Sequence, residues 1–75
     1  MTNSYTAKQK AYLKQIGRNI RKFRKEKGIY QEELAFKANL DRSYIGGVER
    51  GERNVSALNI KKVAEALKIS PKELI

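Results

Sequence analysis

The side chains of this chain that could do chemistry are mostly basic. Seventeen lysines and arginines stand against eight acids, a net charge of +9, and the chain has neither cysteine nor histidine. The commonest general base, the commonest metal ligand and all thiolate sites are therefore excluded. Lys, Glu and Tyr remain, but no nucleophile–base spacing, phosphate-binding glycine loop or metal cluster is visible. We expect neither an enzyme nor a cofactor.

The positive charge is concentrated in the first third of the chain. Nine basic residues and one acid lie between Lys8 and Lys27. This imbalance favours a polyanionic partner, which composition alone leaves as nucleic acid or an anionic membrane. The membrane alternative is disfavoured because a domain this small needs the apolar stripe of the same segment for its core; that stripe is Leu13, Ile16, Ile20 and Phe23. Without a membrane-spanning run or a signal-peptide core, we expect a cytoplasmic protein with no membrane partner.

Helical periodicity and capping residues predict an all-α chain of five short helices. Residues 1–6 are interpreted as a disordered arm and residues 7–75 as one domain. The first four helices are expected at 7–27, 31–38, 42–50 and 57–68. A fifth is expected from Ser70, because SPKE is a capping box with proline at the first helical position.

Two adjacent glycines lie inside the third expected helix. Gly46 and Gly47 each cost a helix interior roughly 0.8–1 kcal/mol relative to alanine. One hypothesis is that their missing side chains let the helix backbone approach a partner closely. The alternative is a close-packed or flexible helix with no such role.

Residues 31–50 have the proportions of a helix-turn-helix, two short helices joined by a turn at 39–41. In that motif the second helix enters the major groove of DNA. RKEKGIYQEELAFKANLDRSYIGGVERGERN, followed by IKKVAEALKISPKEL, strongly resembles the phage-repressor-like helix-turn-helix family of Cro and XRE type, over about residues 13–75. The stretch DRSYIGGVERGERN is most similar to restriction–modification controller proteins and related plasmid or phage regulators, which typically carry serine where Gly46 stands.

The resemblance implies a lambda-repressor-like bundle and a sequence-specific DNA-binding transcriptional regulator with recognition helix 42–50. It implies a positioning ion pair between Arg24 and Glu49. The implied base-reading positions are Arg42, Ser43, Gly46 and Gly47, and the implied phosphate-binding positions are Gln31, Arg50, Arg53 and Asn54. The alternative for Arg42 is a pairing with a phosphate or with Asp41. The alternative for Arg50, Arg53 and Asn54 is an ordinary solvated loop without contact to DNA.

A module of this size binds DNA weakly alone, so we expect a homodimer on a two-fold or repeated operator. The expected dimer surface is the C-terminal helix from Ser70 onward together with the end of the fourth helix, and removing residues 70–75 should leave a monomer. The alternative function is a protein-binding adapter or antitoxin with the same fold, for which Leu74 and Ile75 would be the exposed apolar surface. No small-molecule effector is evident, and the operator and the sign of regulation stay open.

Overall fold

The computed structural model describes residues 4–75, which form four α-helices and one short 3-10 helix. The α-helices are α1 (Ala7–Glu26), α2 (Gln31–Ala38), α3 (Arg42–Glu49) and α4 (Ala57–Leu67), and the 3-10 helix is η1 (Pro71–Glu73). Each α-helix starts at the predicted residue and ends within one residue of the prediction. Of the arm predicted at residues 1–6, residues 1–3 lie outside the described residues.

The predicted number of five helices is wrong, because residues 4–75 contain four α-helices and the fifth segment is only the turn η1. The capping box of Ser70 and Glu73 is present, with Pro71 after Ser70. The bonds that follow span three residues, Glu73 N to Ser70 O and Leu74 N to Pro71 O, both 3.0 Å. Leu74 then enters the core, and its carbonyl oxygen accepts a hydrogen bond from Asn19 Nδ2 at 3.1 Å. Because these two tertiary contacts hold Leu74 in place, the chain does not continue as an α-helix.

Local capping explains where the helices of the helix-turn-helix begin and end. Asp41 Oδ2 accepts a hydrogen bond from Ser43 N at 3.1 Å and so caps α3. Asn39 closes α2 in the left-handed conformation, with φ of 57°. Tyr30 precedes α2 without a side-chain cap, as its residue type predicts. The turn between α2 and α3 therefore lies between Asn39, which ends α2, and Asp41, which caps the start of α3.

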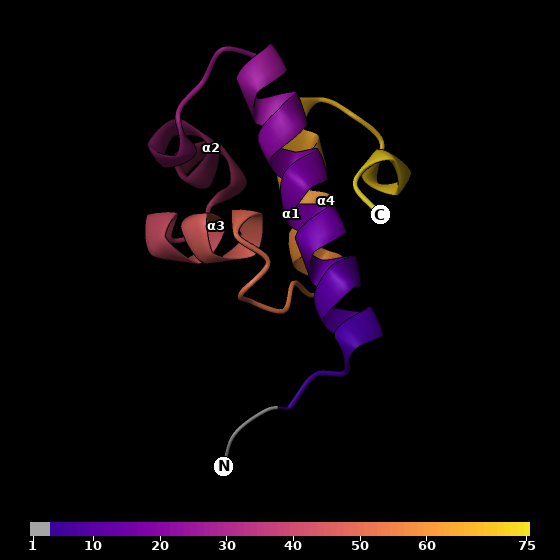
Figure 1. Ribbon diagram of the computed structural model, residues 1–75. Coiled ribbons are helices and arrows are strands. Elements are labelled where there is room, and N and C mark those ends of the chain that lie inside the picture. The colour runs from indigo at the N-terminus through magenta and orange to yellow at the C-terminus, as the bar shows by residue number, and fades with distance from the viewer. Residues whose placement is uncertain (1–3) are drawn as a thin grey trace.

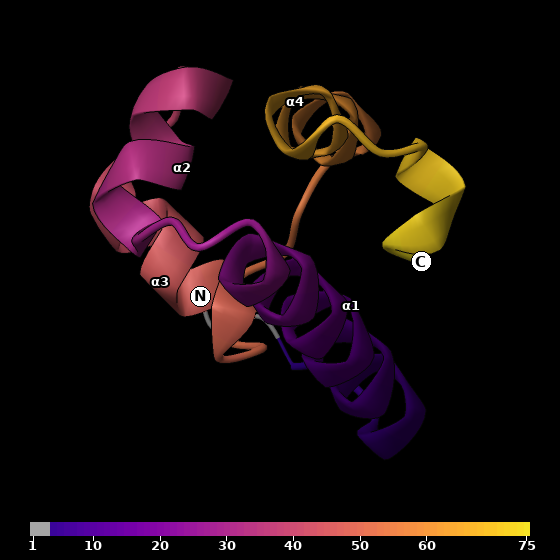
Figure 2. The same ribbon diagram turned by 90° about the horizontal axis from the view of Figure 1, so that it is seen from above.

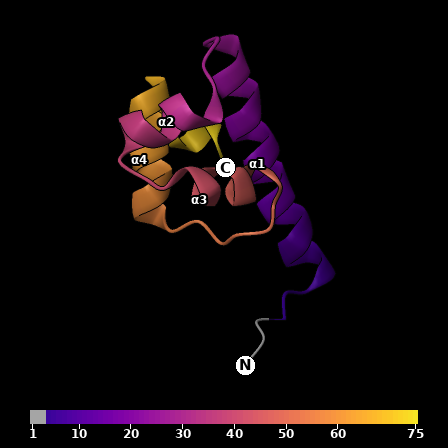
Figure 3. The ribbon, with the colours of Figure 1, turned by 90° about the vertical axis from the view of Figure 1, so that its left-hand side faces the viewer.

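α1 and α2 each pack against α3 and α4, and α1 is the longest of the helices (Figure 1). Seen from above, α2 and α3 lie together on one side, the C-terminal turn lies on the opposite side, and α4 is seen nearly end-on between α2 and that turn (Figure 2). From the side, α2 lies above α3 (Figure 3). The core between them is apolar, and its largest fully buried side chains are Ile20, Leu34, Ile45, Val48, Val63, Leu67 and Leu74.

α1 and α3 approach each other closely at Gly17. A β-carbon at Gly17 would lie 2.4 Å from Val48 O and 2.5 Å from Glu49 O, which is inside van der Waals contact. Only glycine lets α1 lie this close to the C-terminal end of α3 without a backbone shift. Gly17 thereby contributes to the position of α3, a role that the sequence analysis did not identify.

Candidate nucleic-acid interface

A buried ion pair fixes α3 against the rest of the domain. Arg24 Nε donates to Glu49 Oε2 at 2.7 Å and Arg24 Nη2 donates to Glu49 Oε1 at 3.0 Å. Arg24 Nη1 also donates to Ile29 O at 2.9 Å, in the turn before α2. Gln31 Nε2 completes the cluster by donating to Glu49 Oε1 at 3.0 Å. The two residues implied as a structural pair thus join α1, α2 and α3 through charge-assisted hydrogen bonds.

The N-terminus of α3 is exposed and carries polar side chains. Ser43 donates both its amide and its hydroxyl hydrogen to Asp41 Oδ2. The hydroxyl bond, with the amide bond second, lowers the pKa of Asp41 below its ordinary value. The capping carboxylate therefore stays ionised, which favours the positive end of the helix dipole. Because the Ser43 hydroxyl donates to Asp41, its lone pairs remain available as acceptors.

Arg42 lies at the mouth of a polar hollow between the starts of α2 and α3. The hollow has a volume of about 380 Å³, and its lining residues are Arg24, Tyr30, Gln31, Glu32 and Arg42. Arg42 is exposed and has no ion-pair partner within residues 4–75. Its guanidinium therefore remains available to a guanine edge or to a phosphate.

Side chains from outside α3 lie against Gly46 and Gly47. A β-carbon at Gly46 would meet Arg50 Nη1 at 3.3 Å and Gln31 Oε1 at 3.5 Å. At Gly47 a β-carbon would lie 2.5 Å from Arg53 Cγ. Both glycines are buried as a result. The space left by the missing side chains is thus bordered by three residues implied to bind phosphate.

The loop after α3 is held by a tyrosine. Tyr44 Oη donates to Asn54 O at 3.1 Å and accepts from Asn59 Nδ2 at 3.0 Å. The guanidinium carbon of Arg53 lies 5.2 Å from the centroid of the Tyr44 ring. Arg50, by contrast, forms an exposed ion pair with Glu52 at 2.9 Å.

The polar residues implied by the resemblance lie at three places. Gln31, Arg50 and Arg53 border the outer face of α3, and Arg42 and Ser43 lie at its start. Asn54 follows Arg53 in the loop after α3 and lines a hollow beside the first turns of α1, together with Tyr5 and Lys8. The sequence singled out neither Tyr44 nor Asn59 as a functional residue. No local pattern indicates either contact, because both depend on the course of the loop.

In the described part of the chain, no helix has the length and apolar character needed to cross a membrane. Residues 4–75 also contain no group of three or more Asp or Glu side chains arranged to hold a metal ion.

Two helices are joined by a turn in which Asn39 has the left-handed conformation, and basic side chains surround the second helix. This arrangement is that of a helix-turn-helix module for nucleic acid. The chain belongs to the helix-turn-helix family, whose profile matches residues 20–74. The predicted kinship with restriction–modification controllers is confirmed by its relatives. The family consists of DNA-binding transcriptional regulators and not of enzymes.

Three similar proteins illustrate this kinship. The control protein C.BamHI of Bacillus amyloliquefaciens is 47% identical over 61 residues, which cover 80% of this chain and 75% of that protein. The crystal structure of the restriction-modification controller protein C.AhdI from Aeromonas hydrophila is 57% identical with a TM-score of 0.85, and the match covers 87% of this chain and 98% of that one. The controller protein C.Esp1396I, solved as a tetramer with its natural 35 base-pair operator, is 42% identical with a TM-score of 0.75; the match covers 79% of this chain and 78% of that one.

Proposed function

We propose that this chain is a sequence-specific transcriptional regulator of the controller type, which binds a two-fold or repeated operator in the cytoplasm as a homodimer. The observation that carries the proposal is the exposed start of α3, with Arg42 unpaired within the described chain. The buried cluster of Arg24, Glu49 and Gln31 braces α3 behind it. A rigid helix with free polar groups at its start suits the major groove.

The residue roles in this proposal are those that the family resemblance implies. Arg42 and Ser43 read bases, and Gly46 and Gly47 contribute to the face of α3 that meets the groove. Gln31, Arg50, Arg53 and Asn54 contact phosphates, which set the register without reading sequence. Arg50 uses only its Nε in the exposed pair with Glu52, so its Nη groups remain available to a phosphate.

Selection from a random DNA duplex pool at about 0.15 M salt tests the proposal. Sequencing of the bound fraction should recover a palindromic or repeated motif. In a palindromic motif the half-sites should lie about one helical turn, roughly 34 Å, apart. Binding without an enriched motif, lost as salt rises, would mean that only the net charge acts. The protein-binding adapter would then be the better assignment.

Arg42 and Arg53 are expected to differ when each is replaced by alanine. Arg42→Ala should relax base preference at one or two positions, with a loss of roughly 1–3 kcal/mol at the preferred base. Arg53→Ala should weaken binding to all sequences and lower the salt slope by about one unit. Titrations over a panel of single-base operator variants and several salt concentrations measure both effects. If both variants changed the base preference and the salt slope in the same way, the division into base-reading and phosphate-binding residues would be refuted.

The dimer surface of this proposal includes the C-terminal segment. The exposure predicted for Leu74 is wrong, because Leu74 is fully buried, whereas Ile75 is 54% exposed. Ile75 lines a hollow of about 350 Å³ between α1, α4 and η1, whose lining residues carry no charge and include Tyr12, Val55, Ala57, Ile60 and Pro71. Two chains of charge +9 repel each other, so an uncharged apolar face is the surface best suited to a second copy.

Ile75→Asp is expected to convert the dimer into a monomer while leaving the fold intact. Each copy would place a new carboxylate in the apolar contact, where its desolvation is costly. Light scattering gives the mass and circular dichroism the fold. Phe36→Asp is the matched control, because Phe36 is 86% exposed on α2, outside the hollow, and should leave the mass unchanged. An unchanged mass for Ile75→Asp would refute this surface.

A further inference from the structure

The stem of Arg53 occupies the space that a side chain at position 47 would take. A β-carbon at Gly47 would lie 2.5 Å from Arg53 Cγ, 3.4 Å from its Cδ and 3.7 Å from its Cβ. These atoms belong to the part of the side chain nearest the backbone, which cannot yield as the tip can. Any residue other than glycine at position 47 would therefore displace Arg53. The neighbouring Gly46 has no such contact with Arg53.

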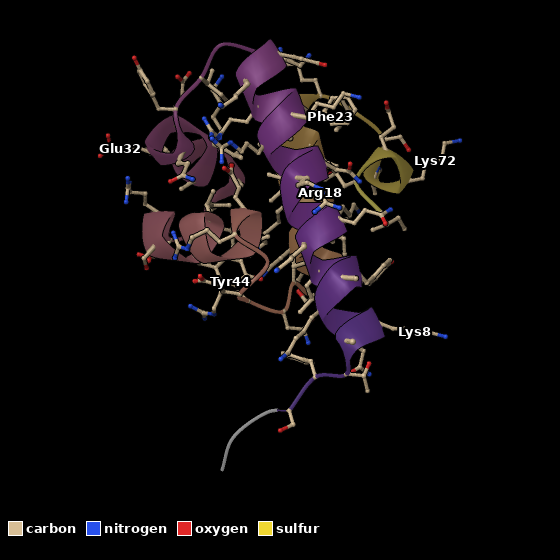
Figure 4. The ribbon with its side chains drawn as sticks, viewed as in Figure 1. Lys8, Arg18, Phe23, Glu32, Tyr44 and Lys72 are labelled. Carbon is tan, nitrogen blue, oxygen red and sulfur yellow. The ribbon has the colours of Figure 1, made fainter. Side chains whose placement is uncertain are left out.

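Tyr44 supports the other end of Arg53. The guanidinium carbon lies 5.2 Å from the ring centroid, within the range of a cation–π interaction. The ring is itself anchored, because its hydroxyl bonds both Asn59 on α4 and the backbone of Asn54. Tyr44 projects from α3 toward the segment that leads to α4 (Figure 4). Arg53 is exposed, but its stem lies in the space beside Gly47 and its tip lies over the ring of Tyr44.

We propose that Gly47 and Tyr44 are positioning residues that seat Arg53 on the outer face of α3, in the orientation with which it contacts DNA. This inference rests on the proposed function. An arginine has many rotamers, and immobilising it at an interface weakens binding. The seat orders the side chain before DNA arrives, so less affinity is lost on binding. Gly47 serves the loop arginine and does not act through an approach of the helix backbone to the bases.

A double-mutant cycle between Gly47→Ala and Arg53→Ala tests the seat. Dissociation constants and salt slopes are measured on the selected operator duplex and on a random-sequence duplex. Gly47→Ala should weaken operator binding roughly 2- to 10-fold and move the salt slope toward that of Arg53→Ala. In the Arg53→Ala background it should change binding by less than about twofold. The same loss in both backgrounds would overturn the proposal and favour direct contact of Gly47 with DNA.

Gly46→Ala is the matched control for the cycle. It makes the same chemical change one residue earlier, but its β-carbon would meet Arg50 and Gln31 and not Arg53. Its effect on binding, whatever its size, should therefore be the same with and without Arg53. Alanine is a better helix former than glycine, so we expect both variants to remain folded with an unchanged or higher Tm.

Replacement of Tyr44 gives a second test that is independent of position 47. Tyr44→Phe keeps the ring beneath the guanidinium and should bind the operator within about twofold of the unmodified protein. Tyr44→Leu removes the ring and should weaken binding roughly 2- to 10-fold only while Arg53 is present. Equal binding by Tyr44→Leu and the unmodified protein would overturn the proposal. If the selection from random DNA recovered no motif, the proposed regulator function itself would fail. That result differs from a failure of the Arg53 seat, in which the motif is recovered but Tyr44→Leu binds it normally.

Discussion

Replacing Glu49 with alanine is expected to lower the free energy of unfolding by about 3–5 kcal/mol. The side chains of Arg24 and Glu49 are only 10% and 3% exposed, so water cannot take the place of the lost carboxylate. Arg24 would remain as a buried cation without its counter-charge, and Gln31 Nε2 would lose its acceptor. Proteins have a total stability of only about 5–15 kcal/mol, so this loss would be a large share of the total. Urea unfolding followed by circular dichroism measures the loss.

An exposed ion pair in the same molecule provides the control. Glu33 and Lys37 on α2 are 3.4 Å apart and their side chains are both 47% exposed. Glu33→Ala should therefore cost no more than about 0.5 kcal/mol. If Glu49→Ala were as stable as Glu33→Ala, Arg24 would have found solvent and the pair would not brace α3.

A double replacement separates the cost of an unpaired charge from the positioning role of the pair. Arg24→Met combined with Glu49→Leu removes both charges and should recover much of the stability, because an apolar pair can replace a buried ion pair. It does not restore the acceptor of Gln31, so operator binding should stay weaker than that of the unmodified protein. Full recovery of both stability and binding would mean that the cluster has no role beyond charge balance.

The helix bounds could be predicted because their signals are local. A capping carboxylate such as Asp41 satisfies an amide two residues later, and a left-handed Asn39 ends a helix within one turn. The same reasoning overestimated the last segment. Its capping box begins a turn, but the burial of Leu74 and its bond with Asn19 are tertiary contacts that no local pattern contains.

The contacts within the candidate interface could not be predicted from the sequence. The resemblance implied Arg42 and Ser43 as base readers and Arg24 and Glu49 as a pair, and of these only the pair is a contact that the structure describes. The covering of Gly47 by Arg53 depends on an irregular loop, whose path is set by Tyr44 and by Asn59 on the next helix. Because such contacts arise from tertiary packing, the periodicity and spacing of residues along the chain do not predict them.

Replacing Leu74 with alanine is expected to lower the free energy of unfolding by about 2–5 kcal/mol. Leu74 is fully buried against the core helices, and the smaller side chain would leave a cavity beneath η1. The control is Ile75→Ala, one residue later, where the side chain is 54% exposed and the change should be within about 0.5 kcal/mol. Thermal and urea unfolding of both variants measure the difference. Equal stabilities would show that the C-terminal turn is not part of the core.

This difference decides how the dimer can be tested. Removal of residues 70–75 was expected to leave a monomer, but it deletes the core residue Leu74 together with the candidate dimer contact. A loss of mass or of DNA binding after truncation would then reflect unfolding as much as dissociation. Ile75→Asp avoids this ambiguity, because it changes the exposed face and leaves Leu74 in place. If Leu74→Ala unfolds the domain while Ile75→Asp only dissociates it, two adjacent residues hold the core and the dimer separately.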